Sequence, residues 1–292
     1  MPVGDISPIG IVKVPKSLVQ SMTRWVSTGH ANFMSGTHSQ TGEDRLHFYT
    51  TSHAPVLNDA KDLDSGAIND GSEWVVWTEY YANMSGLLDH WKKGGESGML
   101  PEFMGMTTMG GGDAEASFVQ PLKVTHEVNH LSPTDEKPRA SLANLAGASQ
   151  LLVKFTVPKD QIPEAEKMIE MHAVWMKDLH DKRTMLGRDI TFEADEELLY
   201  YSAASCPALV NQMDLESGKD PEGKMIFVIT EYYKTKKGLD KQWAHAKEMN
   251  EANGSDFTLA QMSALEEKGM DTLFLQPLEV KASINWFGLG EE

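Results

Sequence analysis

Runs of apolar residues with strand or helix periodicity follow one another along the chain in an order that occurs twice. In the second half, the β-branched run at 151–157 predicts a strand that Pro158 ends. Apolar residues then recur every three or four positions from Ile162 to Leu179, which predicts an amphipathic helix. The other elements of this half are expected as strand, strand, helix, helix and strand, at 198–202, 225–233, 239–252, 259–267 and 273–280.

The first half has the same order of elements. We expect a strand, a helix, two strands, a helix, a short helix and a strand, at 10–14, 16–34, 46–51, 74–81, 87–93, 101–106 and 117–124. Each half therefore predicts the β-α-β-β-α-β arrangement of ferredoxin-like folds. Such a half has helices on one face of its sheet only, so the bare face must be covered, and a second copy can cover it.

Individual residues repeat together with the elements. Thr78-Glu79-Tyr80-Tyr81 recurs as Thr230-Glu231-Tyr232-Tyr233 at an offset of 152 (230 − 78), and Gly86, Leu87 and Trp91 recur at the same offset. His30-Ala31 recurs as His172-Ala173, and Gln120-Pro121-Leu122 as Gln276-Pro277-Leu278. A repeat of about 150 residues has the size of a domain and exceeds that of a solenoid unit. The sequence thus indicates a duplicated domain whose halves pack as a built-in dimer.

These patterns predict an α+β fold of two tandem ferredoxin-like domains that pack sheet to sheet as an intramolecular α/β barrel. The first domain is expected at 1–128 and the second at 148–292. Between them, 129–147 begins with a polar stretch containing Pro133 and Pro138, which is typical of a linker. We expect an internal pseudo-dimer, and the sequence leaves open whether whole chains form further homo-oligomers.

Composition narrows the classes of partner. The 292 residues carry a net charge of −17, which argues against nucleic acid and anionic membrane surfaces because both repel acidic proteins. A single cysteine, Cys206, excludes an intramolecular disulfide and a multi-thiolate metal site. The first residues lack the features of a signal peptide, and no apolar stretch approaches the length of a membrane helix, so a cytoplasmic location is expected.

A family resemblance appears in the repeated segments. A strand ending in Glu and aromatic residues, a helix carrying Trp or His, and a last strand with a Pro-Leu step occur at 75–91 with 118–124 and again at 227–245 with 274–280. This resembles the dimeric α/β-barrel superfamily, and within it the antibiotic-biosynthesis-monooxygenase type. The resemblance implies cofactor-independent monooxygenases or haem-degrading enzymes. About twenty residues separate the second and third strands in each half, where the family usually has a tight hairpin.

The repeated residues are the candidates for chemistry. Because strand residues alternate between faces, one tyrosine of each pair, Tyr80 or Tyr81 and Tyr232 or Tyr233, should face the sheet interior and the other the helices. Glu79 and Glu231 alternate with them, and a carboxylate beside an aromatic cavity can act as a base with a raised pKa. The simpler interpretations are that the tyrosines are packing residues of the barrel and that the glutamates are solvated on the outer face.

The helices add histidines and tryptophans. One histidine recurs in both halves, as His30 and His172, and His172 shares its helix face with Trp175. An imidazole exchanges protons near neutral pH, so His172 near Glu231 or Tyr232 would form an acid–base pair. Trp91 and Trp243 recur on the second helix, with His90 and His245 nearby but not equivalent. The resemblance implies that a histidine on this helix is the axial ligand in haem-degrading members, and His245 is the closer match. Core packing explains these residues equally well.

Two classes of function remain open on this evidence. The first is an oxidoreductase that resembles cofactor-independent monooxygenases and acts on an apolar aromatic or polyketide-type molecule, with no cofactor and no metal ligands assigned. Its sites would be His172, Glu231, Tyr232 and Trp243 in the second half, and His30, Glu79, Tyr80 and Trp91 in the first. The second is a protein that binds or carries an apolar or tetrapyrrole-like ligand, including haem. The replacement of His90 by Gln242 suggests that at most one half keeps the full chemistry.

Overall fold

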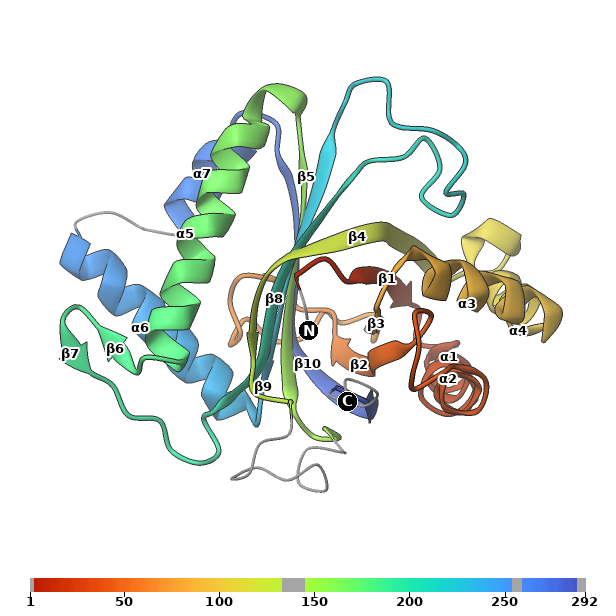
Figure 1. Cartoon of the computed structure of the whole chain (residues 1–292), viewed down its shortest axis with the longest axis horizontal. Coiled ribbons are helices and arrows are strands. Elements are labelled where there is room, and N and C mark those ends of the chain that lie inside the picture. Colours follow the sequence, from red (N-terminus) through yellow and green to blue (C-terminus); the bar gives the residue numbers. More distant parts are fainter. Residues whose placement is uncertain (1–2, 133–144, 254–258, 288–292) are drawn as a thin grey trace. The chain divides into compact units, whose positions relative to one another are not determined.

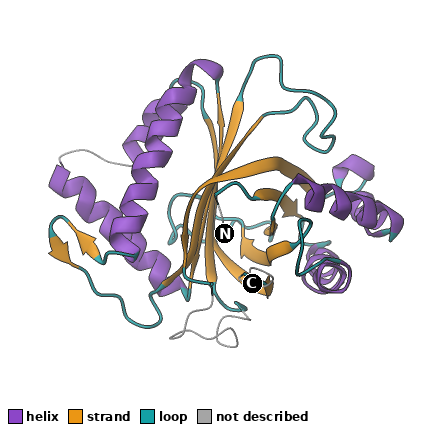
Figure 2. Cartoon of the chain, in the orientation of Figure 1, coloured by secondary structure: helices purple, strands orange, loops and turns teal. Residues whose placement is uncertain are grey.

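The computed structural model describes residues 3–132, 145–253 and 259–287 (Figure 1). Most of the expected linker, residues 133–144, lies outside the described residues, so its assignment as a linker stays a prediction. The helices and strands follow the order expected from the sequence (Figure 2). An additional two-stranded ribbon, β6 (Thr184–Met185) and β7 (Arg188–Asp189), was not foreseen, because strands of two residues leave no periodic signal.

The first half has a strand, a helical segment, two strands, two helices and a long last strand, in that order. The strands are β1 (Ile6–Val14), β2 (Leu46–Pro55), β3 (Glu73–Tyr81) and β4 (Glu115–Asn129). The helices are α1 (Val19–Arg24), α2 (Ala31–Thr37), α3 (Met84–Glu96) and α4 (Met99–Met106). A π-helical segment, Trp25–His30, joins α1 to α2 and ends at one of the candidate histidines. Such local π-helical turns are often found at functional sites.

The second half repeats this arrangement with one uninterrupted first helix. Its strands are β5 (Ser149–Val157), β8 (Leu198–Pro207), β9 (Met225–Tyr233) and β10 (Asp271–Asn285). Its helices are α5 (Ile162–His180), α6 (Lys236–Asn253) and α7 (Leu259–Glu266). Pro163 lies in the first turn of α5, where its missing N–H costs no helical hydrogen bond.

The eight long strands are hydrogen-bonded in the order β1-β3-β2-β10-β5-β9-β8-β4, which closes into a barrel. The strand pairs β1–β3 and β2–β3 are antiparallel, as are their counterparts β5–β9 and β8–β9. The predicted α+β class with a duplicated ferredoxin-like half and an α/β barrel is therefore confirmed.

Two compact units make up the chain. The first comprises residues 1–123, 131–147 and 278–292, and the second comprises 124–130 and 148–277. The last part of β4 thus belongs to the second unit, and the last part of β10 to the first. The boundaries 1–128, 129–147 and 148–292 stay a prediction. They assign one continuous segment to each half, whereas each compact unit combines separate segments of the chain.

Close packing explains why particular residues recur in both halves. A Cβ atom on Gly86 would lie 2.9 Å from the Asp44 carbonyl oxygen and 2.9 Å from Tyr81 Cδ1. A Cβ atom on Gly238 would lie 2.7 Å from the Glu196 carbonyl oxygen and 2.9 Å from Tyr233 Cβ. Only glycine lets α3 and α6 begin this close to the end of the preceding strand.

The repeated tryptophans and glutamines also form matched pairs. Trp91 donates its indole N–H to Gln120 Oε1 at 2.8 Å, and Trp243 donates to Gln276 Oε1 at 2.9 Å. Each bond ties the second helix of a half to its last strand. The indole N–H is thereby satisfied, and the ring faces a cavity described below.

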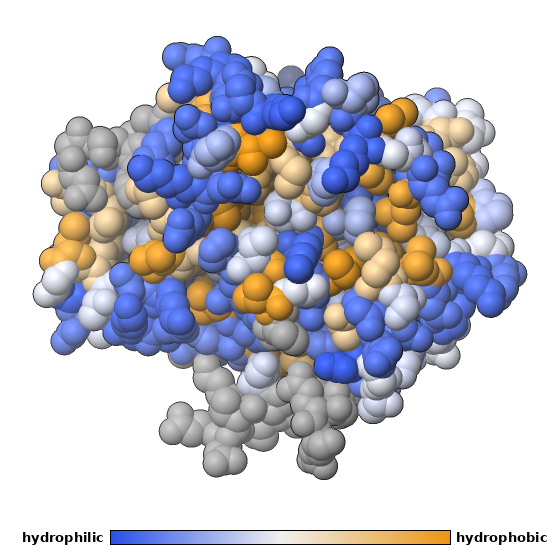
Figure 3. All heavy atoms as spheres, turned by 45° about the horizontal axis from the view of Figure 1, so that its top comes forward, coloured by the Kyte–Doolittle hydropathy of each residue, from blue (hydrophilic) through white to orange (hydrophobic). Residues whose placement is uncertain are grey.

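The surface is mainly hydrophilic on the face shown in Figure 3, with apolar residues in separate patches. None of the described helices is long and apolar enough to cross a membrane. Cys206 is buried, and burial raises the pKa of its thiol to about 12, as expected for a packed side chain and not a reactive one.

Candidate functional site

In each unit, described residues of the helices and strands line a cavity that contains several of the candidate side chains. The cavity of the first unit has about 490 Å³ of empty space including its mouth, and that of the second has about 560 Å³. The first is lined by Pro8, Trp25, His30, Phe33, Trp77, Glu79, His90, Trp91, Gly94, Met99, Leu100, Phe103 and Phe118. The second is lined by Leu151, Val153, Phe155, Met168, His172, Trp175, Ile229, Glu231, Gln242, Trp243, Ala246, Met262 and Phe274.

One glycine makes room for a tryptophan ring in the first cavity. Gly10 on β1 pairs with Trp77 on β3, and a Cβ atom at Gly10 would lie 2.1 Å from the Trp77 ring. The indole ring therefore lies directly over the backbone of β1. In the second unit, Val153 on β5 pairs with Ile229 on β9, and both line the cavity as aliphatic side chains.

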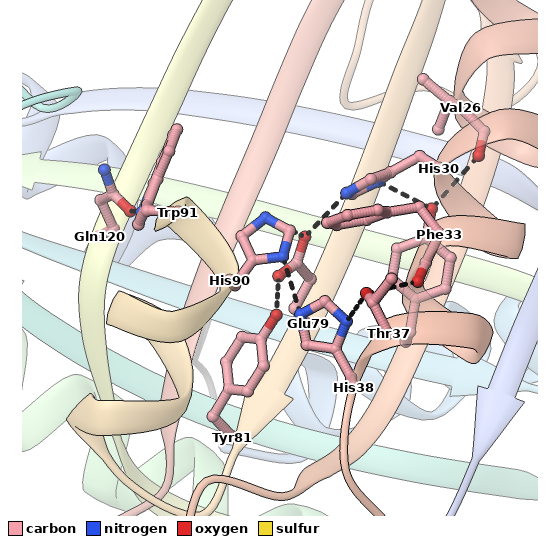
Figure 4. Close-up of polar contacts among 11 residues, drawn as sticks. Val26, His30, Phe33, Thr37, His38, Glu79, Tyr81, His90, Trp91 and Gln120 are labelled. Carbon is pink, nitrogen blue, oxygen red and sulfur yellow. Dashed lines mark hydrogen bonds and ion pairs between the residues drawn. The ribbon is translucent and has the colours of Figure 1, made fainter. Parts of the chain in front are cut away.

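In the first cavity, two histidines approach one carboxylate. Glu79 Oε1 lies 3.7 Å from His30 Nε2 and 3.7 Å from His90 Nε2. His30 comes from the π-helical segment, Glu79 from β3 and His90 from α3, and their side chains converge in Figure 4. One ligand atom of each lies within 4.8 Å of the others. Glu79 is 1% exposed, so this is a dry, polar cluster in an aromatic cavity.

The outer atoms of the first cluster are held by a second layer of side chains. Tyr81 donates its hydroxyl to Glu79 Oε2 at 2.6 Å, and the Tyr49 hydroxyl lies 3.1 Å from His30 Nδ1. His90 Nδ1 lies 3.1 Å from His38 Nε2 (Figure 4).

In the second cavity, one histidine approaches one carboxylate. His172 Nε2 on α5 lies 3.6 Å from Glu231 Oε1 on β9, and both side chains are buried. The Tyr201 hydroxyl lies 3.2 Å from His172 Nδ1, and Tyr233 donates its hydroxyl to Glu231 Oε2 at 2.5 Å. These contacts match those of His30, Tyr49, Glu79 and Tyr81 one for one.

The two cavities differ where His90 is replaced. Gln242 occupies the equivalent position on α6 and directs its amide away from the carboxylate. Its Oε1 accepts from His180 Nε2 at 3.1 Å, and its Nε2 donates to Met176 Sδ at 2.9 Å. The second cavity therefore holds a two-residue pair where the first holds three residues.

Burial shifts the pKa values of both pairs toward their neutral forms. Burial raises the pKa of Glu231 to about 7, opposed in part by the hydrogen bond from Tyr233, and lowers that of His172 to about 4. Burial likewise raises the pKa of Glu79 to about 8, and burial with nearby His38 lowers that of His30 to about 3. At neutral pH the imidazoles are uncharged, and Glu231 is close to half ionised. A carboxyl in this range can serve as a general base.

The structure brings many of the predicted residues to the cavities but turns one tyrosine pair away. His30, Glu79, His90 and Trp91 line the first cavity, and His172, Trp175, Glu231 and Trp243 line the second. Tyr81 and Tyr233 lie behind the carboxylates and hydrogen-bond to them.

Tyr80 and Tyr232 point to the opposite face of their strands because strand residues alternate. The Tyr232 hydroxyl accepts from Gln150 at 3.0 Å, and Tyr80 packs on Phe48. Of the two partners considered from the sequence for His172, the structure places Glu231 beside it and Tyr232 on the other face, and Tyr201 is a further partner.

His245 does not fit the role of an axial haem ligand. Its ring packs on Phe192 at 5.4 Å, and it is not among the described residues that line the second cavity. Gln242 and Trp243, three and two residues earlier in α6, do line that cavity. His245 is therefore not placed to hold a haem in the second cavity.

Sequence reasoning missed the supporting residues. His38 and His180 correspond at the same offset as His30 and His172 (180 − 38 = 172 − 30 = 142), and Tyr49 corresponds to Tyr201. This shared offset was a usable signal, since both histidines lie in α5 in the second half, and His38 directly follows α2 in the first. No metal ligands were assigned from the sequence, because His30, Glu79 and His90 belong to three separate elements.

Comparisons with known proteins identify the fold. No protein-family model and no curated protein matches the chain. Among solved structures, it is similar to a proposed monooxygenase from Fusobacterium nucleatum subsp. nucleatum, with a TM-score of 0.51 and 11% identity over 99% of this chain and 98% of that one. It also matches an anthrone oxidase-like protein (TM-score 0.49, 9% identity, 99% and 97% covered) and chlorite dismutase from Candidatus Nitrospira defluvii (0.35, 9%, 98% and 92%). The first likeness, together with the closed eight-stranded barrel, shows that the chain has the fold of the dimeric α/β-barrel superfamily.

Proposed function

We propose that the chain is a small-molecule enzyme of the cofactor-independent monooxygenase type, and that the second cavity is its reaction site. The substrate is an apolar aromatic molecule of polyketide type. The observation that carries the proposal is the buried His172–Glu231 pair, 3.6 Å apart in the wall of a cavity lined otherwise by apolar and aromatic side chains and Gln242. Such a cavity suits a flat aromatic ring system, and the pair supplies acid–base chemistry at one point of it.

In this proposal Glu231 is the base and His172 orients and stabilises it. The carboxylate takes a proton from an acidic C–H of the substrate, and the resulting carbanion gives electrons to O2 directly. Recombination forms a carbon–oxygen bond and a hydroperoxide. Loss of the second C–H proton then breaks the O–O bond, forms the ketone and releases hydroxide, which the protonated carboxyl converts to water.

The reaction balances without another reductant. A methylene group and O2 become a ketone and H2O, so one oxygen atom enters the product and the other leaves as water. The substrate carbon loses four electrons, and O2 accepts four. The substrate therefore supplies all the electrons, and the protein supplies position and proton transfer.

The test is oxygen uptake by the purified chain with 1,8-dihydroxyanthrone, a tricyclic aromatic ketone with an acidic methylene. We expect turnover to the quinone, and a loss of at least about tenfold in His172→Phe, which removes the neighbour that orients the base and leaves Glu231 in place. Tyr232→Phe is the matched control, because this tyrosine lies on the opposite face of β9, and it should keep the wild-type rate.

Two outcomes would contradict the proposal. If His172→Phe consumes oxygen at the wild-type rate, His172 is a packing residue. If the chain binds the probe tightly without oxygen uptake, or if it purifies with a Soret band, a carrier of apolar or tetrapyrrole ligands is the better assignment.

A further inference from the structure

In the first cavity two histidines and a glutamate approach one another, whereas the described residues that line the second cavity include only one histidine and one glutamate. The positions of the protons follow from the hydrogen-bond network around His30. The Tyr49 hydroxyl lies 3.3 Å from the Val26 carbonyl oxygen, to which it can only donate, and 3.1 Å from His30 Nδ1. When its one proton goes to Val26, the hydroxyl accepts from His30 Nδ1, and the His30 proton is then on Nδ1. His30 Nε2 then carries a lone pair, and this lone pair faces Glu79 Oε1.

The same reasoning applies to His90 through a longer chain. The Thr37 hydroxyl donates to the Phe33 carbonyl oxygen at 2.7 Å, so it accepts from His38 Nδ1 at 3.0 Å. Neutral His38 then has a bare Nε2, which accepts the proton of His90 Nδ1 at 3.1 Å. His90 Nε2 is left with a lone pair that also faces Glu79 Oε1 (Figure 4).

With Glu79 ionised, three electron-pair donors face one point, and the imidazole protons point outward. The separations of 3.7 Å from Glu79 Oε1 to both Nε2 atoms are too long for hydrogen bonds. Ligands about 2.1 Å from a tetrahedral ion lie about 3.4 Å apart, so the two separations of 3.7 Å need to contract by only a few tenths of an ångström. A cation between these atoms would satisfy all three.

We infer that the first cavity is a binding site for one divalent first-row transition-metal ion, with His30 Nε2, Glu79 Oε1 and His90 Nε2 as ligands. Two imidazoles and one carboxylate form the donor set that such ions take in open sites with a free coordination position. All three ligands line the cavity, so the free positions face it. The inference is independent of the proposed oxygenase activity, which belongs to the second cavity.

The second layer of contacts supports this assignment. Histidine ligands of metals nearly always donate their other ring N–H to a fixed partner, which sets the tautomer and the ring orientation. His30 and His90 both do so, toward Tyr49 and His38, and Tyr81 fixes the carboxylate. In the second unit, Gln242 turns its amide toward His180 and Met176, so the third donor is lost there.

The experiment uses tag-free protein freed of metal with a chelator and then titrated with Co²⁺ and Zn²⁺. We expect one ion bound per chain by elemental analysis after gel filtration, and visible absorption bands from bound Co²⁺. His90→Gln copies the residue of the second unit, so it should fold normally, and it should weaken binding by at least about 100-fold. His126→Gln makes the same change at an exposed histidine and should bind like the wild type.

A gain-of-site variant sharpens the test. Gln242→His restores the third donor in the second unit, and we expect the stoichiometry to rise from one ion to two. The proposal is overturned if the wild type binds neither ion, since the first cluster then holds only a proton. It is also overturned if His90→Gln binds as the wild type does, or if Gln242→His still binds a single ion.

Discussion

The two cavities share a scaffold and differ at one polar position. Both place a histidine of the first helical segment 3.6–3.7 Å from a glutamate of the third strand, and both hold that glutamate with the tyrosine two residues further on. The first adds His90, and the second has Gln242 in its place. Three donors can coordinate an ion, whereas two leave a pair that exchanges protons. Duplication thus gives one chain two chemical environments through a single substitution.

The largest effect that separates the cavities concerns turnover. Glu231→Gln removes the proposed base, so we expect oxygen uptake with 1,8-dihydroxyanthrone to fall about 10²- to 10⁴-fold. Glu79→Gln makes the same change in the first cavity and should lower the rate by less than about threefold. Steady-state oxygen-electrode measurements on both variants decide this. An equal loss in both variants would mean that the cavities do not divide the chemistry.

Packing should affect both halves alike. Gly238→Ala and Gly86→Ala each introduce a Cβ atom less than 3.0 Å from backbone and tyrosine atoms. We expect each to lower the free energy of unfolding by about 1–3 kcal/mol, the usual cost of overpacking. Gly95→Ala on α3 meets no atom within 4 Å and should raise it by up to about 1 kcal/mol. Chemical denaturation measures all three, and a stable Gly238→Ala would contradict this reason for the repeated glycine.

The smallest expected difference between the two cavities concerns the pH dependence of turnover. Glu231 must be ionised to act as a base, and burial raises its pKa to about 7, so the rate should increase with pH through about 7. The hydrogen bond from Tyr233 favours the carboxylate. Tyr233→Phe should therefore raise this pKa and move the rising limb to higher pH by about one unit.

Tyr81→Phe is the matched variant for that profile. It removes the equivalent hydrogen bond in the first cavity and should leave the profile of turnover unchanged. A rate that decreases as pH rises through 7, or a shift in Tyr81→Phe alone, would show that Glu231 is not the base.

The order of elements and the pairing of the halves could be predicted from periodicity and repeated residues, because both are local patterns. His30 and His172 could be selected because they are retained among diverged neighbours. The convergence of His90 with Glu79 could not be predicted, since it depends on how α3 packs against β3. The choice between Tyr232 and Tyr233 also failed, because alternation gives two faces but only strand pairing shows which one the helices cover.

The most direct test of the difference between the cavities is an anomalous difference map from crystals soaked in Zn²⁺ and measured at the zinc absorption edge. We expect one peak about 2.0–2.2 Å from His30 Nε2, Glu79 Oε1 and His90 Nε2, and no peak beside His172 and Glu231. A peak at both pairs, or at neither, would contradict the claim that the exchange of His90 for Gln242 separates the chemistry of the two halves.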